Sequence, residues 1–130
     1  MAGKFTRLQK TYLVEGADAV EMYRGVTYGA SEGSCRKPAA DNAVPLGVVD
    51  NDAREAGQAG KQVAVKLEGI AAIQLTGTVA YGQRVILAAN GFARALPTAA
   101  GQYNVLGFAE NAGVNGDVIP VRMAFHAFTV

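Results

Sequence analysis

Short apolar runs separated by turn residues are the feature that most constrains the fold of this chain. From residue 20 onward, such runs end repeatedly at Gly, Asn, Asp or Pro, a spacing typical of β-sandwiches and small β-barrels. Gly occurs 16 times, and the hydrophobic 50% is mostly Ala and Val, which suits strands and tight turns better than long helices. Strands are expected at Val20–Tyr28, Leu46–Val49, Gln62–Leu67, Ile70–Leu75, Arg84–Ala88, Phe92–Ala95, Val105–Ala109 and Val118–Val130. The sequence therefore predicts an all-β protein with at most a short helix, at 51–60.

The length of 130 residues predicts a single domain that folds without a disulfide or a structural metal. We assign residues 20–130 to one β-rich barrel or sandwich-like domain. Within it, Asn90-Gly91 forms a two-residue turn signal, because both positions accept a positive φ. A hairpin over Val85–Ala95 is predicted.

The N-terminal segment differs from the rest of the chain in charge and pattern. Residues 1–14 carry a charge of +3, which leaves nine basic and eleven acidic residues, a charge of −2, for the remainder. No sustained periodicity appears before residue 19. We predict an extended arm over 1–19, which either frays or becomes ordered on a partner.

The last predicted strand has an apolar end that needs to be covered. Pro120 cannot donate to a sheet, so this strand is expected at an edge or with a bulge at the proline. Its end, Met123–Val130, is apolar on both alternating faces, and an exposed edge of that kind invites pairing. It is expected to be covered either within the monomer or by a neighbouring subunit.

Two parts of the chain have similar sequences. The segment 46–51 (LGVVDN) resembles 106–111 (LGFAEN), and each is followed, after a loop, by an alternating stretch with a basic residue near its end, 63–67 and 119–123. The pattern indicates a strand, an acidic turn, a loop and a strand used twice. A chance match of small residues is the alternative.

Catalytic motifs are present only in fragments. Gly29-Ala30-Ser31-Glu32-Gly33 matches G-x-S-x-G, with His126 downstream, but Pro38 soon follows, where the motif requires a helix. Cys35 and His126 are single residues without a local signature. We predict that the chain is not an enzyme.

Cofactor, metal and membrane signals are also incomplete. The segment 57–61 lacks the first glycine and the Ser/Thr of a phosphate-binding loop, and 50–55 departs early from a calcium loop. The sequence predicts no cofactor, no metal and no membrane span. A net charge of +1 argues against a nucleic-acid partner.

The order of several small-residue motifs resembles the head-decoration, or capsid cement, proteins of tailed bacteriophages. The motifs are 25–29 (GVTYG), 46–49 (LGVV), 63–70 (VAVKLEGI), 76–85 (TGTVAYGQRV), 105–109 (VLGFA) and 116–122 (GDVIPVR). The resemblance covers about three-quarters of the chain. It implies a compact β-tulip-type fold, made in the host cytoplasm and carried on the virion. It further implies that a homotrimer binds the major capsid protein at three-fold and quasi-three-fold sites and stabilises the expanded shell.

Two sets of contact residues follow as hypotheses. The basic, apolar N-terminal segment is assigned to the shell through Lys4, Phe5, Arg7, Leu8, Lys10, Tyr12 and Leu13. The apolar end of the last strand is assigned to the subunit interface through Phe125, His126, Phe128 and Val130. Two alternatives stay open: a phage fibre or surface module that binds carbohydrate or a receptor, and a small serine esterase that uses Ser31.

Overall fold

The structure, a computed structural model, describes residues 5–15, 19–50 and 62–130, and side chains from Arg7 onward. These residues form nine strands and one 3-10 turn. The elements are β1 Phe5–Val14, β2 Arg24–Tyr28, β3 Ser34–Arg36, β4 Gly47–Val49, β5 Gln62–Gln74, β6 Arg84–Leu87, the 3-10 turn Ala89–Gly91, β7 Ala93–Ala95, β8 Gln102–Ala109 and β9 Val118–Thr129. The all-β prediction is confirmed. The expected helix at 51–60 lies outside the described residues.

The first half of the chain closes into a five-stranded barrel. Its strand order is β1-β3-β2-β4-β5, and β1 pairs antiparallel with β5 to complete the circle. The barrel encloses small apolar side chains, as the composition suggested. Its buried core consists of Tyr12, Val14, Val20, Val26, Cys35, Leu46, Val49, Val63 and Val65.

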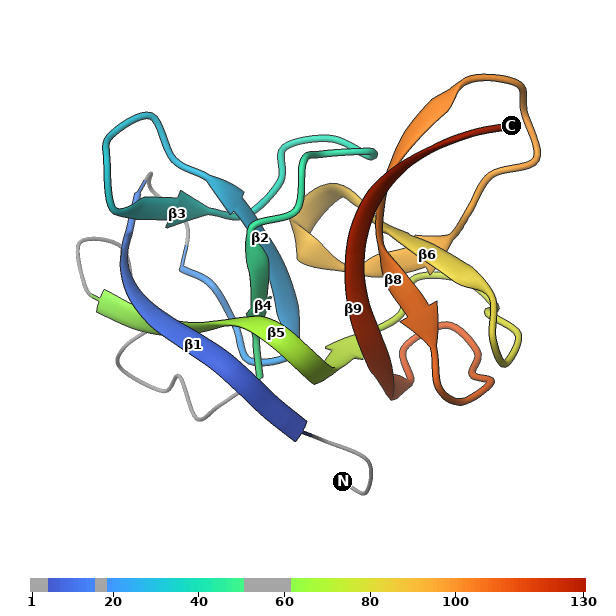
Figure 1. Ribbon diagram of the computed structural model, residues 1–130, viewed down its shortest axis with the longest axis horizontal. Helices are drawn as coiled ribbons and strands as arrows, with labels where there is room; N and C mark the ends of the chain where they lie inside the picture. The colour runs from blue at the N-terminus through green and yellow to red at the C-terminus, as the bar shows by residue number, and fades with distance from the viewer. Residues whose placement is uncertain (1–4, 16–18, 51–61) are drawn as a thin grey trace.

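The remaining strands form a second group that shares β5 with the first. Figure 1 shows β1–β4 on the left, β6, β8 and β9 on the right, and β5 running between them. The order continues as β5-β9-β8-β6-β7, and a parallel bridge from Leu75 to Ala93 joins the end of β5 to β7. A second core fills this half, with Ile73, Val85 and Leu106 at 1% exposure or less.

The second half repeats the first in strand order and in register. In the first half β4 lies on β5 with Val48 opposite Lys66, and in the second β8 lies on β9 with Phe108 opposite Arg122. The parallel β1–β3 pairing of the first half corresponds to the parallel bridge between β5 and β7. The two similar segments of the sequence therefore belong to a structural repeat.

The turns before β2 and before β6 are also equivalent in the two halves. Tyr23 and Gly82 both adopt a positive φ, of 69° and 78°. The N–H of Tyr23 donates to the carbonyl of Val49 at 2.6 Å, and that of Gly82 donates to the carbonyl of Ala109 at 2.8 Å. The first hydrogen bond connects the turn before β2 to the end of β4, and the second connects the turn before β6 to the end of β8.

The predicted arm is extended, but it is part of the barrel. β1 pairs with β5 from Phe5 opposite Ile70 to Leu13 opposite Gln62, which corrects the expectation of a separate segment over 1–19. The backbone groups of β1 gain partners in this ladder, and Tyr12 fills the core. Residues 1–4 and 16–18 lie outside the described residues.

Pro120 lies inside the sheet, where an edge or a bulge was expected. It is paired with Ala72 of β5, and its carbonyl accepts a hydrogen bond from the N–H of Glu110 at 2.9 Å. Because the N and C=O of one strand residue point to the same side, the missing N–H faces the end of β8 and leaves the ladder to β5 intact. The irregularity in β9 comes later, after Met123.

The predicted hairpin is confirmed, with a longer connection. Val85 is opposite Ala95, and the N–H of Ala88 donates to the carbonyl of Phe92 at 2.7 Å, so three residues form the turn. Asn90 and Gly91 both have a positive φ, as the sequence suggested.

Candidate binding surface

The G-x-S-x-G segment forms a turn that is held by Glu15. The Glu15 carboxylate accepts hydrogen bonds from the N–H of Ala30 at 2.7 Å, the N–H of Ser31 at 3.2 Å and the hydroxyl of Ser34 at 2.9 Å. These bonds lower the pKa of Glu15, those from the Ala30 amide most. The segment thus behaves as a carboxylate-capped turn between β2 and β3.

Replacing Glu15 by glutamine is expected to destabilise the protein at neutral pH. The carboxylate has a pKa below its ordinary value of 4.5 in the folded state, so its contribution is present above that value and is lost as the pH falls through the lowered pKa. Urea midpoints of both proteins, measured from pH 7 downward, should therefore converge in acid. Glu32→Gln, at an exposed residue of the same turn, is the matched control and should follow the wild type throughout.

Ser31 and Cys35 are not brought together with His126. Cys35 is in β3 and Ser31 precedes it in the turn after β2, both in the barrel of the first half, whereas His126 is on β9 in the second half. Cys35 is fully buried, and burial raises the pKa of its thiol to about 11. The His126 ring already has partners at both nitrogens, Ala124 and Arg84.

The residues assigned to the shell are divided between the two sides of β1. Leu8 is 49% exposed and Leu13 is 44% exposed, whereas Tyr12 lies in the barrel core. Arg7 is exposed and pairs with Glu68 at 3.4 Å. The exposed Lys10 has its ammonium 5.2 Å from the centre of the Tyr12 ring. Lys4 lies outside the described residues, and Phe5 is placed in β1 by its backbone alone.

The residues assigned to the subunit interface are divided between two faces of β9. Phe125 is 42% exposed and lines a groove. His126, Phe128 and Val130 lie on the other face, where His126 and Phe128 are half-buried against Arg84 and Val130 is 40% exposed.

The groove lies where β1 and β9 separate along β5. Ile70 is opposite both Phe5 of β1 and Arg122 of β9, and from there the two strands diverge. The space between them has a volume of about 690 Å³. Its lining residues are Arg7, Leu67, Glu68, Gly69, Ile70, Arg122, Met123, Ala124 and Phe125.

Among the described residues, β9 has a strand on one side only beyond Arg122. Residues 123–129 pair with β8, and the pairings to β5 end at Arg122. Val130 exchanges two backbone hydrogen bonds with Gly101, so by strand alternation the N–H groups of Ala127 and Thr129 point to the open side. The described part of the chain thus leaves a free edge of apolar character, which agrees with the edge expected from the sequence.

Comparison with known proteins adds a structural relationship. No family model and no curated protein sequence matches the chain. The crystal structure of the head fiber gp8.5 N base of bacteriophage phi29 matches it with a TM-score of 0.66, over 90% of this chain and 93% of that one, at 17% sequence identity. The chain therefore shares its fold with this structure.

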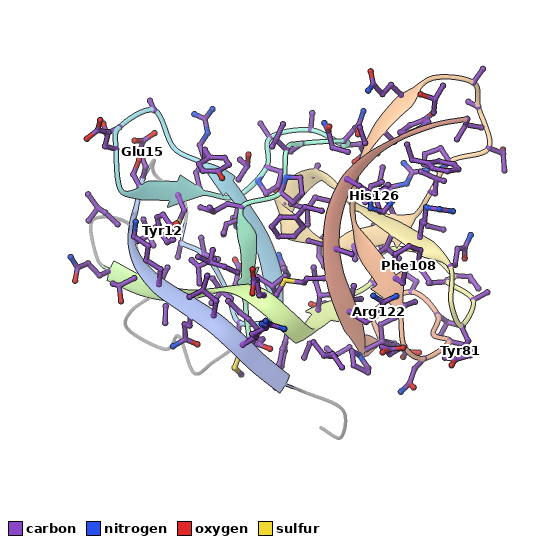
Figure 2. All side chains as sticks on the ribbon, viewed as in Figure 1. Tyr12, Glu15, Tyr81, Phe108, Arg122 and His126 are labelled. Atoms are coloured by element: carbon purple, nitrogen blue, oxygen red, sulfur yellow. The ribbon has the colours of Figure 1, made fainter. Side chains whose placement is uncertain are left out.

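The surface of the second half contains a cluster that sequence analysis missed. Arg84, Phe108 and Arg122 lie side by side on β6, β8 and β9, and Figure 2 shows Phe108, Arg122 and His126 gathered on these strands. In the sequence, only the internal repeat pointed to a member of this cluster, because it places Arg122 at the position of Lys66. Among the described residues, no group of three or more His, Cys, Asp or Glu is placed to hold a metal, and no helix is long and apolar enough to cross a membrane.

Proposed function

We propose that the chain is a structural protein of a phage virion that binds the outer surface of the icosahedral head as a homotrimer. There it stabilises the expanded shell, with the major capsid protein and sister copies as partners, and it acts by binding and not by catalysis. The observation that carries this proposal is the fold, which is shared over nearly the whole chain with a phage head fiber base. The order of motifs along the sequence supports the same assignment.

The free edge of β9 supports self-association. Unpaired N–H and C=O groups on an apolar strand favour pairing with another chain. The repeat shows what covers such an edge: the corresponding part of β5, residues 70–74, is covered by β9 in antiparallel pairing. We assign residues 123–129 and the exposed Phe125 to contact with a sister copy.

The outward side of β1 is the part that we assign to the shell. Leu8 and Leu13 are large apolar residues that remain exposed although neighbouring side chains of β1 fill the core. A trimer presents three such strands at once, so weak individual contacts combine into tight binding.

The same similarity supports a second candidate, the base of a fibre on the phage head, because the matched structure is itself a head fiber base. Both candidates place the protein on the outside of the virion. They differ in whether a further polypeptide is attached to it, which electron microscopy of heads carrying the protein would distinguish.

Light scattering and sedimentation test the proposal on one pair of variants. The wild type should have three times the monomer mass of 13.5 kDa and should sediment with expanded phage heads. Ala127→Pro removes one N–H on the open edge and spares the ladder to β8, so it should be monomeric and bind heads at least 10-fold more weakly. Ala127→Ser is the matched control. A wild-type monomer that does not sediment with heads contradicts the proposal.

A further inference from the structure

On the surface of the second half, two arginines lie on either side of a phenylalanine across three neighbouring strands. Arg84 of β6 is opposite Phe108 of β8, which in turn is opposite Arg122 of β9. The guanidinium carbons of Arg84 and Arg122 lie 5.3 Å and 5.0 Å from the centre of the Phe108 ring. Two cations therefore share one aromatic ring.

Arg84 is held in place by further contacts. Its guanidinium lies 4.0 Å from the centre of the Phe128 ring, and its Nε–H donates to Nε2 of His126 at 3.3 Å. The His126 ring is stacked on Phe108, with 5.7 Å between the ring centres, and its Nδ1–H donates to the carbonyl of Ala124 at 2.6 Å. Packing thus fixes Arg84 through its Nε and leaves the terminal amino groups of its fork available.

No acidic partner of Arg84 or Arg122 is found in the part of the chain that the structure describes. Elsewhere, Arg7 pairs with Glu68, Arg24 with Glu21 at 3.0 Å, and Arg94 with Asp41 at 2.6 Å. Among the residues that the structure describes, neither Arg84 nor Arg122 has a carboxylate within ion-pair distance. Two guanidinium groups near one ring make the potential of this surface positive and favour an anion there. Each guanidinium fork is suited to a carboxylate that accepts two parallel hydrogen bonds from it.

We propose that Arg84 and Arg122 form a binding site for a carboxylate-bearing segment of a partner polypeptide. The inference deepens the proposed function, on which it rests, by adding to the contact through β1 a second contact with the shell protein and its chemistry. It requires an acidic side chain at the centre of the contact, held by charge-assisted hydrogen bonds.

A neighbouring pocket indicates what flanks the carboxylate. Arg84 and Phe128 also line a space of about 530 Å³ together with Leu96, Pro97 and Val130. An apolar side chain beside the acidic residue fits this mainly apolar wall. A carbohydrate or an unpaired base would need an open aromatic face. Here the Phe108 ring is in contact with His126, Arg84 and Arg122, and Arg84 lies over Phe128.

A peptide titration tests this site on the isolated protein. The probe is a fluorescent, N-acetylated and C-amidated pentapeptide with two glutamates flanking a central leucine. The same peptide with two glutamines is its control. The wild type should bind the acidic peptide at least 10-fold more tightly than the neutral one, with weaker binding at high salt. Arg84→Gln and Arg122→Gln should each reduce the affinity at least 5-fold.

Two controls make the outcome decisive. Arg36→Gln removes an exposed arginine from β3 in the first barrel and should leave the affinity unchanged. Arg84→Lys retains the charge without the fork and should recover only part of the affinity, while melting curves confirm that each variant is folded. The inference is overturned if no peptide binds, if Arg36→Gln weakens binding as much as the others do, or if a sulfated oligosaccharide binds in place of the peptide. No heads are used, so this failure leaves the head-binding experiment standing.

Discussion

Replacing Lys66 by methionine is expected to lower the free energy of unfolding by about 3–5 kcal/mol, because it removes the ammonium group that pairs with a buried carboxylate. Lys66 and Asp50 are 0% and 1% exposed, and Nζ lies 2.8 Å from Oδ2. The ammonium also donates to the carbonyl of Ile70 at 3.2 Å, and the same Oδ2 accepts from the N–H of Ala72 at 3.0 Å. The pair therefore ties β4 to β5 where β5 passes from one half to the other.

The repeat supplies the matched control for this substitution. Arg122 holds the position of Lys66 in the second half but is exposed, so Arg122→Met should change the stability by about 0.5 kcal/mol or less. Adding Asp50→Asn to Lys66→Met should recover at least half of the loss, because the neutral amide still accepts from Ala72. Urea denaturation measures all three variants. A Lys66→Met protein as stable as Arg122→Met would show that the buried pair does not contribute as argued.

The repeat could be predicted from the sequence because its signals are local. A glycine before the pairing residue and a basic residue in the following strand occur in both halves, and these positions depend on close backbone approach and not on long-range packing. The sequence did not predict that the barrel and the second group of strands share β5. Residues 62–67 and 70–75 were read as separate strands, whereas Gly69, with a φ of 116°, continues β5 from one half into the other.

The N-terminal strand escaped prediction for a different reason. Its pairing with β5 shifts register twice, at Thr6/Leu8 and at Leu8/Gln9, so a period of two residues is lost where the basic residues lie. Of the side chains of β1 that the structure describes, only Tyr12 and Val14 point into the core. The charge then suggested an arm, although the backbone of the segment closes a barrel. Deleting residues 1–14 would remove that closure and is unsuitable as a test of shell binding.

The candidate binding surface could not be read from the sequence because it depends on register. Arg84, Phe108 and Arg122 come from three strands, and a shift of one residue in either pairing would move one of them to the opposite face. The separate location of Phe125 and His126 has the same origin, since the irregularity after Met123 changes which residues share a face. The sequence identified the apolar end of β9, but not its two distinct surroundings.

Replacing either of two glycines of the repeat by alanine should destabilise the protein as much as a substitution in the core does. A Cβ at Gly47 would overlap the carbonyl oxygen of Lys66, and a Cβ at Gly107 would overlap that of Arg122, both closer than the 3.0 Å that real Cβ atoms keep. The obstacle in each case is strand backbone, which cannot rotate away as a side chain can. We expect each substitution to cost about 3 kcal/mol, since the crossing strands must separate to admit the methyl group.

Gly33→Ala separates this steric effect from the general cost of replacing a glycine. Gly33 has a φ of 73° and no atom within 4 Å of its Cβ position, so alanine there meets only the strain of the left-handed region, about 1 kcal/mol. Thermal and urea unfolding of the three variants should rank Gly33→Ala as the mildest and the other two as similar to each other. Similarity between Gly47→Ala and Gly107→Ala is the part of the result that depends on the repeat, because the two positions share a backbone crossing and little else. If only one of them were destabilised, the two halves would share a strand order without sharing this crossing.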